Sequence, residues 1–210
     1  MTDKQELVVI VDYGMGNLRS VAKVVERSHV PYIISADSAD ISLATRLILP
    51  GVGAFGDGMA NLQARGLVDA LDNAVIENGT PLLGICLGME LLAIDSEEHG
   101  FTQGLGWLPA HVQRISPGGD LRVPHVGWNG IRPRSNGGLF AGFPPGATFY
   151  FTHSYVMHCD DEENISATCT YGETFPAAVV RGNVAGCQFH PEKSQRNGGV
   201  LIHRFINEGI

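Results

Sequence analysis

The strongest constraint on the fold is a set of apolar runs separated by helical segments in the first half of the chain. Leu7–Tyr13 (LVVIVDY) is apolar at nearly every position, which is typical of a strand buried on both faces of a sheet. Leu18–Arg27 follows it with apolar residues at helical spacing. Strands joined through helices form right-handed crossovers, so this half predicts a parallel sheet with helices on both faces. The other predicted strands are Tyr32–Ile34, Arg46–Pro50 and Pro81–Ile85, with one or two helices over Gly58–Asn78 and another over Leu87–Ile94.

The second half of the chain changes character. Short β-rich segments divided by Gly, Pro and Asn predict hairpins and an antiparallel extension of the sheet, followed by a closing helix over Ser194–Ile206. With 210 residues and no break in composition, we expect a single domain over residues 1–210. The predicted strands of this half are Val112–Ile115, Gly127–Ile131, Thr148–Phe151, Ile165–Thr170, Ala177–Val180 and Val184–Phe189.

Composition excludes several classes of function. The net charge of −8 argues against a nucleic-acid partner, because neutralising phosphates needs clustered Lys and Arg. No apolar run is long enough for a secretion signal or a membrane span, and the four cysteines form no CxxC pair, so we expect a cytoplasmic protein. The eight histidines show no ligand spacing, and Gly14-x-Gly16 lacks the third glycine of a dinucleotide loop because position 19 is Arg. We therefore expect no metal and no cofactor.

One segment carries the pattern of a nucleophile. In Gly84-Ile85-Cys86-Leu87-Gly88 a cysteine lies between a predicted strand and a predicted helix, with a glycine two residues away on each side. This is the thiol form of the G-x-S-x-G turn, whose sharp bend exposes a nucleophile. The glycines are needed because a Cβ at either position would collide with the neighbouring strand or helix. The helix N-terminus favours the Cys86 thiolate and leaves the backbone N–H of Leu87 free to donate to an oxyanion.

A cysteine nucleophile needs a base, and the base needs a group that orients it. His190-Pro191-Glu192 directly follows the last predicted strand. Side chains at positions i and i+2 of an extended segment point the same way, so His190 and Glu192 can both face Cys86. We therefore predict a Cys86–His190–Glu192 triad. The remaining cysteines, Cys159, Cys169 and Cys187, are interpreted as buried structural residues.

The pairing of G-x-C-x-G with a distant F-H-P-E resembles the class I glutamine amidotransferases, a Cys-His-Glu family that releases ammonia from glutamine. Here the two motifs are Gly84–Gly88 and Phe189–Glu192. Pro50-Gly51-Val52-Gly53 stands where most of the class has P-G-G, and it is similar to the loop of the imidazole glycerol phosphate synthase glutaminases. Three more segments resemble that family, in order along the chain: Asp12–Ser20 (DYGMGNLRS), Pro124–Asn129 (PHVGWN) and Tyr150–Tyr155 (YFTHSY).

This resemblance implies a fold, a reaction and a partner. The fold would be an α/β three-layer sandwich with a central, mostly parallel sheet, helices on both faces and an antiparallel β extension. Glutamine would acylate Cys86 and release ammonia, and water would hydrolyse the thioester to glutamate. The ammonia would pass through a tunnel to a (β/α)₈-barrel cyclase subunit, the other half of a heterodimer. That subunit would form imidazole glycerol phosphate and AICAR in histidine biosynthesis.

The resemblance also implies roles for individual positions. Val52 and Gly53 match the loop that completes the oxyanion hole, together with the N–H of Leu87. The matching glutamine-binding positions are Gly51, Glu90, Ser154 and Tyr155, and those that face the cyclase in the family are Asn17, Trp128, Tyr150 and Lys193. Without the resemblance, Trp128 and Tyr150 would be interpreted as ordinary core aromatics.

Glu90 departs from the family pattern. The family usually continues the elbow as C-L-G-M-Q, where the Gln side chain helps to hold the substrate, and this chain has Glu at that position. A carboxylate cannot donate as an amide does, and its charge opposes a thiolate beside it. Either the carboxylate binds the α-ammonium group of the substrate or it is protonated in place, and in both cases we expect weaker glutamine binding.

Three alternatives stay open from the sequence. The first is a paralogous glutaminase that supplies ammonia to a surface-sugar amidino-transfer pathway. The second is a cysteine peptidase or related hydrolase on the same kind of sheet, against which the P-G-V-G loop and the immediate H-P-E argue. The third is a non-catalytic interaction module, for which Glu90 is the only support.

Overall fold

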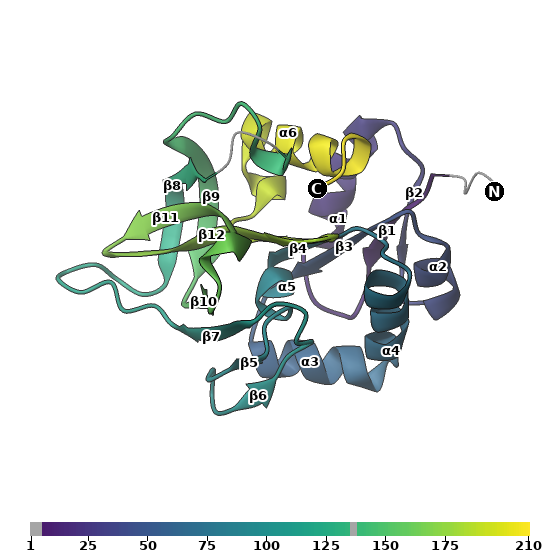
Figure 1. Cartoon of the computed structure of the whole chain (residues 1–210), viewed down its shortest axis with the longest axis horizontal. Coiled ribbons are helices and arrows are strands. Elements are labelled where there is room, and N and C mark those ends of the chain that lie inside the picture. Colours follow the sequence, from purple (N-terminus) through teal and green to yellow (C-terminus); the bar gives the residue numbers. More distant parts are fainter. Residues whose placement is uncertain (1–5, 135–137) are drawn as a thin grey trace.

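A mixed sheet runs through the middle of the molecule (Figure 1). The computed structural model describes residues 6–134 and 138–210, and nine strands of the described residues form this sheet. Five neighbouring strands are parallel, in the order β2 (Tyr32–Ser35), β1 (Val8–Val11), β3 (Arg46–Gly51), β4 (Leu82–Cys86) and β13 (Val184–Cys187). Four antiparallel strands extend it, in the order β12 (Glu173–Arg181), β11 (Ile165–Tyr171), β8 (His125–Pro133) and β9 (Ala147–His153).

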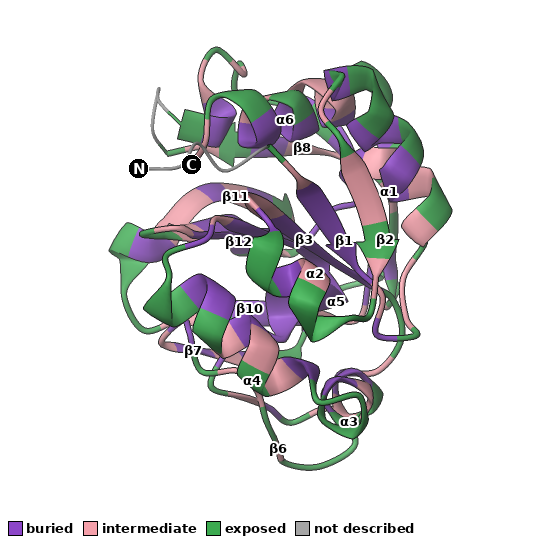
Figure 2. Cartoon of the chain, turned by 90° about the vertical axis from the view of Figure 1, so that its right-hand side faces the viewer, coloured by how far each residue is buried: buried purple, intermediate pink, exposed green. Residues whose placement is uncertain are grey.

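Helices cover both faces of the parallel half, which gives three layers. Helices α1 (Leu18–Val25) and α6 (Gln195–Asn207) lie on one face. Helices α2 (Ser38–Leu43), α3 (Phe55–Ala64) and α4 (Leu67–Asp72) lie on the other. Figure 2 shows the buried strands between these helices, whose outer sides are exposed.

The apolar run in β1 explains this arrangement. Its side chains alternate between the two faces: Val8 and Ile10 pack with the buried residues of α1 and α6, whereas Val9 and Val11 pack with those of α3 and α4. All four side chains are fully buried, and burial of each contributes about 1.5–3 kcal/mol. A strand with two apolar faces therefore requires a layer of helices on each side.

A second, smaller sheet lies beside the elbow. It has the order β10 (Tyr155–Cys159), β7 (Ala110–Arg114), β5 (Asp95–Ser96) and β6 (Thr102–Gln103). The sequence pattern predicts that Val112–Ile115 extends the main sheet, but this prediction is wrong, because the segment pairs with β10 and β5 instead. The reason is that the chain turns at Ser154 after β9 and continues as β10, which then pairs antiparallel with β7.

Other boundaries also differ from the predicted ones. The helix α5 that follows the elbow covers only Leu87–Glu90, whereas the predicted helix continues to Ile94. After Glu90 the backbone bonds to segments later in the chain: the carbonyl of Leu91 accepts from the N–H of Leu105, and the N–H of Ile94 donates to the carbonyl of Ala110 at the start of β7. Helix α2 and strands β5, β6 and β10 are absent from the sequence-based assignment. The remaining elements are short 3₁₀ or π turns at Glu26–Ser28, Asn73–Glu77, Gly138–Phe140, Glu162–Asn164 and Pro191–Lys193 (η5).

The strand order brings the predicted functional segments to one edge of the sheet. Gly51, the last residue of β3, lies opposite Cys86, the last residue of β4, and β13 is the other neighbour of β4. The carboxyl ends of parallel strands meet at the same edge, which is where open α/β sheets bind ligands. Within the part of the chain that the structure describes, no helix is long and apolar enough to cross a membrane.

Candidate active site

Cys86 lies on a sharp bend between β4 and α5. Its backbone has φ 54° and ψ −113°, a conformation that L-residues rarely adopt. The two flanking glycines make the bend possible. A Cβ at Gly84 would lie 2.5 Å from the carbonyl oxygen of Gly88, and a Cβ at Gly88 would overlap the carbonyl oxygen of Leu49 in β3. The structure thus contains the predicted elbow, with its glycines at the predicted close contacts.

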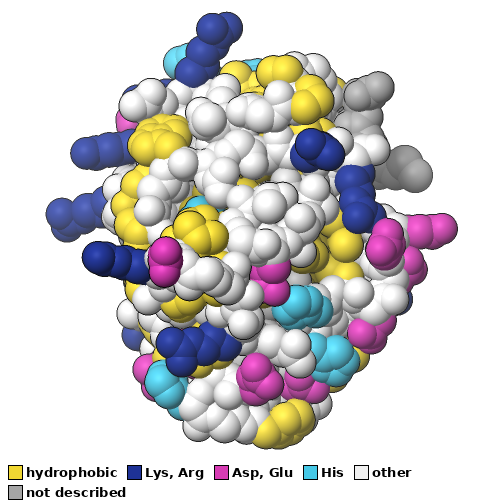
Figure 3. Space-filling model, turned by 90° about the vertical axis from the view of Figure 1, so that its left-hand side faces the viewer, with side chains coloured by type: hydrophobic (Ala, Val, Ile, Leu, Met, Phe, Trp, Pro, Cys, Tyr) yellow, Lys and Arg dark blue, Asp and Glu magenta, His cyan; other side chains and the backbone are white. Residues whose placement is uncertain are grey.

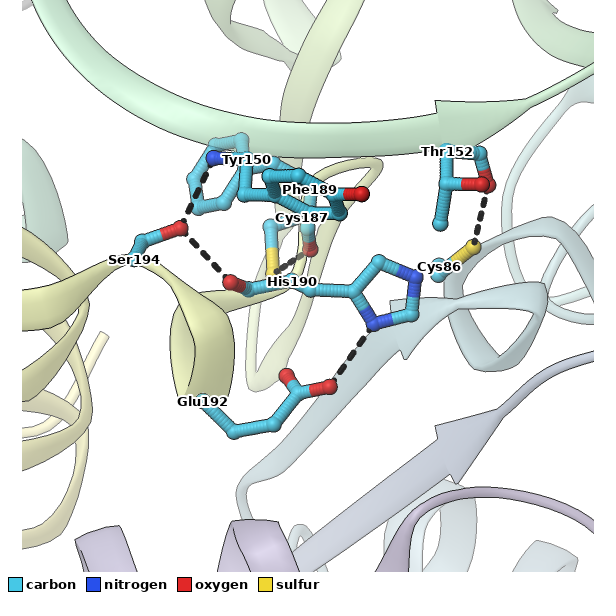
Figure 4. A network of polar contacts seen from close by, with 8 residues as sticks. All are labelled: Cys86, Tyr150, Thr152, Cys187, Phe189, His190, Glu192 and Ser194. Atoms are coloured by element: carbon cyan, nitrogen blue, oxygen red, sulfur yellow. Dashed lines mark hydrogen bonds and ion pairs between the residues drawn. The ribbon is translucent and has the colours of Figure 1, made fainter. Parts of the chain in front are cut away.

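His190 lies between Glu192 and Cys86 (Figure 4). Its Nδ1 is 2.8 Å from Oε1 of Glu192, and both side chains are only 2% exposed. A carboxylate accepts, so Nδ1 carries the proton and Nε2 is left as the acceptor. Nε2 is buried and has no hydrogen-bond partner among the described residues, and Figure 4 shows it on the side of Cys86. A free basic nitrogen therefore faces the thiol.

Backbone contacts hold His190 in this position. Its N–H donates to the carbonyl of Tyr150 in β9 at 2.8 Å. The hydroxyl of Ser194 donates to the carbonyl of His190 at 2.6 Å and accepts from the N–H of Tyr150 at 2.9 Å (Figure 4). Pro191 begins the turn η5, which carries Glu192 back under the imidazole ring.

The electrostatics of Cys86 differ from the sequence-based expectation. Burial raises the pKa of the Cys86 thiol well above its usual range, and the carboxylate of Glu90 raises it further. The backbone N–H of Leu87 and the ammonium of Lys193 lower it, but by less. A four-residue helix such as α5 brings a small dipole, and desolvation outweighs it. In this conformation Cys86 is a thiol, whose Sγ donates to the carbonyl of Thr152 at 3.9 Å.

A pocket of about 320 Å³ opens above the thiol. Most of the predicted positions line it: Cys86, His190, Val52, Gly53, Leu87, Glu90, Ser154 and Tyr155. Gly51 and Glu192 do not line it. Gly51 lies beneath the loop, where a Cβ would overlap the hydroxyl of Tyr13, and Glu192 lies behind the imidazole ring. Four further residues of the wall were not predicted: Glu98, Pro124, Thr152 and His153.

Glu90 is buried at the base of this pocket, with 5% of its surface exposed. Its Oε1 accepts a hydrogen bond from Nε2 of Gln188 at 2.7 Å. Burial raises the pKa of Glu90 to about 7, and the nearby carboxylate of Glu98 adds to the rise, whereas the Gln188 bond opposes it. Near neutral pH the carboxyl is therefore present in both its neutral and its charged form.

The predicted partner-facing residues are accessible. Trp128 is 48% exposed, and Asn17 and Lys193 are exposed as well. Trp128 lies opposite Tyr150 in the β8–β9 pair with their rings edge to face at 6.1 Å, and Nζ of Lys193 is 5.6 Å from the centre of the Tyr150 ring. Trp128 is thus no core aromatic. Figure 3 views the molecule from the side of β8 and β11, where hydrophobic side chains reach the surface among Lys and Arg.

Comparison with known proteins identifies the family. The sequence matches the family described as glutamine amidotransferase class-I over residues 9–207. The chain belongs to this family.

Individual relatives cover almost the whole chain. The sequence is 49% identical over 198 residues to the imidazole glycerol phosphate synthase subunit HisH of Moorella thermoacetica, covering 94% of this chain and 93% of that protein. It is 46% identical over 203 residues to the subunit of the same name from Geobacter sulfurreducens, covering 94% and 97%. A crystal structure of a glutamine amidotransferase matches with a TM-score of 0.71 at 22% identity, covering 95% of this chain and 97% of that one. The predicted fold class is confirmed.

Some of the site residues that were not predicted carry a signal in the sequence, and others carry none. Thr152 and His153 belong to the recognised Tyr150–Tyr155 segment, but that segment alone does not show which side chains line a pocket. Gln188 is two residues before His190 on an extended stretch. The spacing therefore predicts that the two side chains lie on the same face of the strand. Glu98 follows no motif, because it reaches the pocket through the loop before β6, where its carboxylate accepts from the N–H of Phe55 at 2.6 Å. Of the other cysteines, Cys169 and Cys187 are buried and Cys159 is half-buried.

Proposed function

We propose that this chain is the glutaminase subunit of an imidazole glycerol phosphate synthase and that Cys86, His190 and Glu192 are its catalytic triad. The observation that carries the catalytic assignment is the buried His190, whose Nδ1 is bonded to Glu192 and whose free Nε2 faces the thiol at the strained elbow. The 49% identity across 94% of the chain to a HisH subunit supports the pathway.

The first half of the reaction forms a thioester. Nε2 of His190 takes the proton of the Cys86 thiol, and the sulfur attacks the carboxamide carbon of glutamine. The resulting imidazolium is stabilised by Glu192, which keeps the proton on Nδ1 in both states of the ring. When the C–N bond breaks, the imidazolium gives its proton to the departing nitrogen and ammonia leaves.

The second half regenerates the enzyme. His190 removes a proton from a water molecule, the hydroxide adds to the thioester carbon, and the C–S bond breaks. The imidazolium returns its proton to the departing sulfur, so the products are glutamate and the free thiol. Both halves pass through an oxyanion beside Cys86. Leu87, at the first position of α5, and Val52 and Gly53 line this part of the pocket, and we assign their backbone N–H groups as the oxyanion donors.

Substrate recognition is assigned to the remaining walls. Ser154 and Tyr155 present their backbone to glutamine on one side, and Gly51 supports the oxyanion loop from below, where no side chain fits. The carboxylate of Glu90 meets the α-ammonium group of glutamine. Its protonated form has no charge for that contact, so we expect the affinity for glutamine to fall as pH decreases below about 7.

The raised pKa of Cys86 supports dependence on a partner. The thiol must give its proton to His190 before it attacks, and the burial that raises its pKa opposes this transfer, so we expect little glutamine hydrolysis when the chain is alone. We place the cyclase subunit on the cluster formed by Trp128, Tyr150 and Lys193, together with Asn17. Lys193 is adjacent in sequence to Glu192, so this surface begins one residue from the triad. The two subunits form a heterodimer in which ammonia passes directly to the cyclase.

The decisive experiment reconstitutes the chain with the (β/α)₈ cyclase of the same organism. Glutamate release should rise when the cyclase and its ribotide substrate are both present, and imidazole glycerol phosphate and AICAR should form. Cys86→Ala should abolish synthesis from glutamine but leave synthesis from ammonium salts intact. Glutamate release without these two products would overturn the pathway assignment, and glutamine-dependent synthesis retained in Cys86→Ala would overturn the triad.

A further inference from the structure

Two buried histidines outside the triad form a hydrogen-bonded pair at the wall of the pocket. His125 begins β8, His153 ends β9, and the two are direct partners in the antiparallel pair. They are 3% and 6% exposed. Nδ1 of His125 is 2.9 Å from Nε2 of His153. His153 lines the pocket, whereas His125 lies behind it, so the pair connects the substrate pocket with the interior of the antiparallel half of the sheet.

The neighbours of the pair determine which nitrogen carries each proton. Nδ1 of His153 is 2.8 Å from the carbonyl oxygen of Tyr155, which can only accept, so Nδ1 of His153 carries a hydrogen. Its Nε2 is then an acceptor, and Nδ1 of His125 donates to it.

The position of the proton on His125 is determined in the same way. Nδ2 of Asn129 lies 3.2 Å from Nε2 of His125 and donates to the carbonyl of Thr170 at 3.0 Å, while Oδ1 of Asn129 accepts from the N–H of Gly130. These contacts orient the amide without ambiguity. All donors point one way, from Asn129 through His125 and His153 to the carbonyl of Tyr155.

This arrangement accepts no further proton. An imidazolium at either ring would place an N–H against another donor, and both residues are buried. His125 is stacked between Phe151 and Tyr171, with ring centres at 5.0 Å and 4.1 Å. Burial lowers the pKa of His125, and it lowers that of His153 to about 4. His153 also differs from His190 in that both of its nitrogens are bonded, so it has no free nitrogen for proton transfer.

The hydrogen bond to Tyr155 closes the turn that joins β9 to β10. The residues on either side of His153 in this turn, Thr152, Ser154 and Tyr155, also line the pocket. The carbonyl of Thr152 also accepts the Cys86 thiol. A change in the angle of this turn would therefore move both the backbone that faces the substrate and the carbonyl that faces the nucleophile.

We propose that His153, held in one tautomer by His125 and Asn129, is a positioning residue that fixes the Thr152–Tyr155 turn for glutamine binding. This inference rests on the proposed function, because it names what the turn is positioned for. The hydrogen bond to the Tyr155 carbonyl carries the effect, and the bond to His125 orients the ring that makes it.

Two substitutions of His153 separate these contacts. The side-chain amide of Asn reaches the place of Nδ1 and can still donate to Tyr155, whereas that of Gln reaches the place of Nε2 and can still bond His125. We expect His153→Asn to keep the glutamine KM within about threefold of wild type, and His153→Gln and His153→Phe to raise it about tenfold or more, as losing one buried hydrogen bond does. In all three variants we expect a smaller change in kcat.

The measurements use the full chain with its cyclase. Circular dichroism and the melting temperature report whether each variant folds. Nitrogen-15 spectra of labelled histidine should show His153 neutral, with its proton on Nδ1, from pH 5.5 to 8.

The outcomes distinguish a failure of the positioning role of His153 from a failure of the proposed function. An active wild type in which His153→Asn and His153→Gln have the same KM overturns the positioning role, as does a His153 that carries its proton on Nε2. A wild type with no glutaminase activity beside its cyclase overturns the proposed function, and the substrate role of the turn with it. A KM increase confined to the Gln and Phe variants supports the inference.

Discussion

Replacing Glu90 with Gln should remove a pH-dependent loss of stability. In the folded chain burial raises the pKa of Glu90 from its ordinary value of 4.5 to about 7. Below pH 4.5 the carboxyl is protonated in both the folded and the unfolded state. As the pH rises from 4.5 to 7, the unfolded chain loses this proton and the folded chain keeps it, so the free energy of unfolding falls. Above pH 7 the whole contribution is lost.

The magnitude follows from the two pKa values. The full difference corresponds to about 3 kcal/mol, and most of it is lost between pH 5 and pH 8. Gln has the same shape, and its Oε1 can still accept from Nε2 of Gln188. The free energy of unfolding of Glu90→Gln, taken relative to wild type, should therefore be about 2–3 kcal/mol higher at pH 8 than at pH 5. For a chain of this length that is a change of roughly 5–10 °C in the difference between their melting temperatures.

The assay is thermal or urea unfolding of both chains at pH 5 and pH 8, so that all other titrating groups cancel in the comparison. Glu97→Gln is the matched control, because Glu97 is exposed and surface substitutions change stability by less than about 0.5 kcal/mol. If the difference in free energy of unfolding between Glu90→Gln and wild type is the same at both pH values, the idea that Glu90 is held in a dehydrated site is refuted. If this difference is smaller at pH 8 than at pH 5, the predicted direction of the pH dependence is wrong.

Four further outcomes are expected. Glu192→Gln should lower kcat by roughly 10²–10⁴-fold with little change in glutamine KM, because Glu192 orients His190 and does not line the pocket; a larger effect on KM would contradict this. Alkylation of Cys86 in the isolated chain should be slow at pH 7 and still be rising at pH 9, since burial raises the pKa of the thiol; a plateau below pH 8 would show a thiolate that is already formed. Trp128→Ala should weaken cyclase binding by about 2 kcal/mol, or roughly 30-fold, as measured by titration calorimetry, while Ile76→Ala, also an exposed position, should leave it unchanged. Gly88→Ala should cost about 3 kcal/mol of stability or more, measured by urea unfolding, because its Cβ would overlap the backbone of β3.

The elbow and its base were predictable because they depend on local rules. Gly84 and Gly88 indicate a sharp bend, because a side chain at either position would collide with neighbouring backbone. The two-residue spacing of His190 and Glu192 puts both side chains on one side of an extended segment. The charge state of Cys86 was not predictable. The sequence shows a helix N-terminus that favours the thiolate, whereas the pKa depends on how much water the surrounding walls exclude, and burial raises it.

The same division holds for Glu90. Its departure from the family pattern is visible in the sequence, but its partner Gln188 is 98 residues away and becomes its neighbour only because β13 pairs with β4.

Local patterning by itself determined the layered α/β class, because a strand with two apolar faces must be covered on both. It also determined which residues can form an elbow and a triad, since these follow from steric limits and from side-chain direction within a few residues. Tertiary structure alone decided that β7 and β10 form a separate sheet, that His153 lines the pocket with both nitrogens bonded, and that Glu98 reaches it from a loop. The physical reason is that hydrogen-bond partners, burial and protonation are set by chain segments brought together from distant positions, and no single stretch of sequence contains that information.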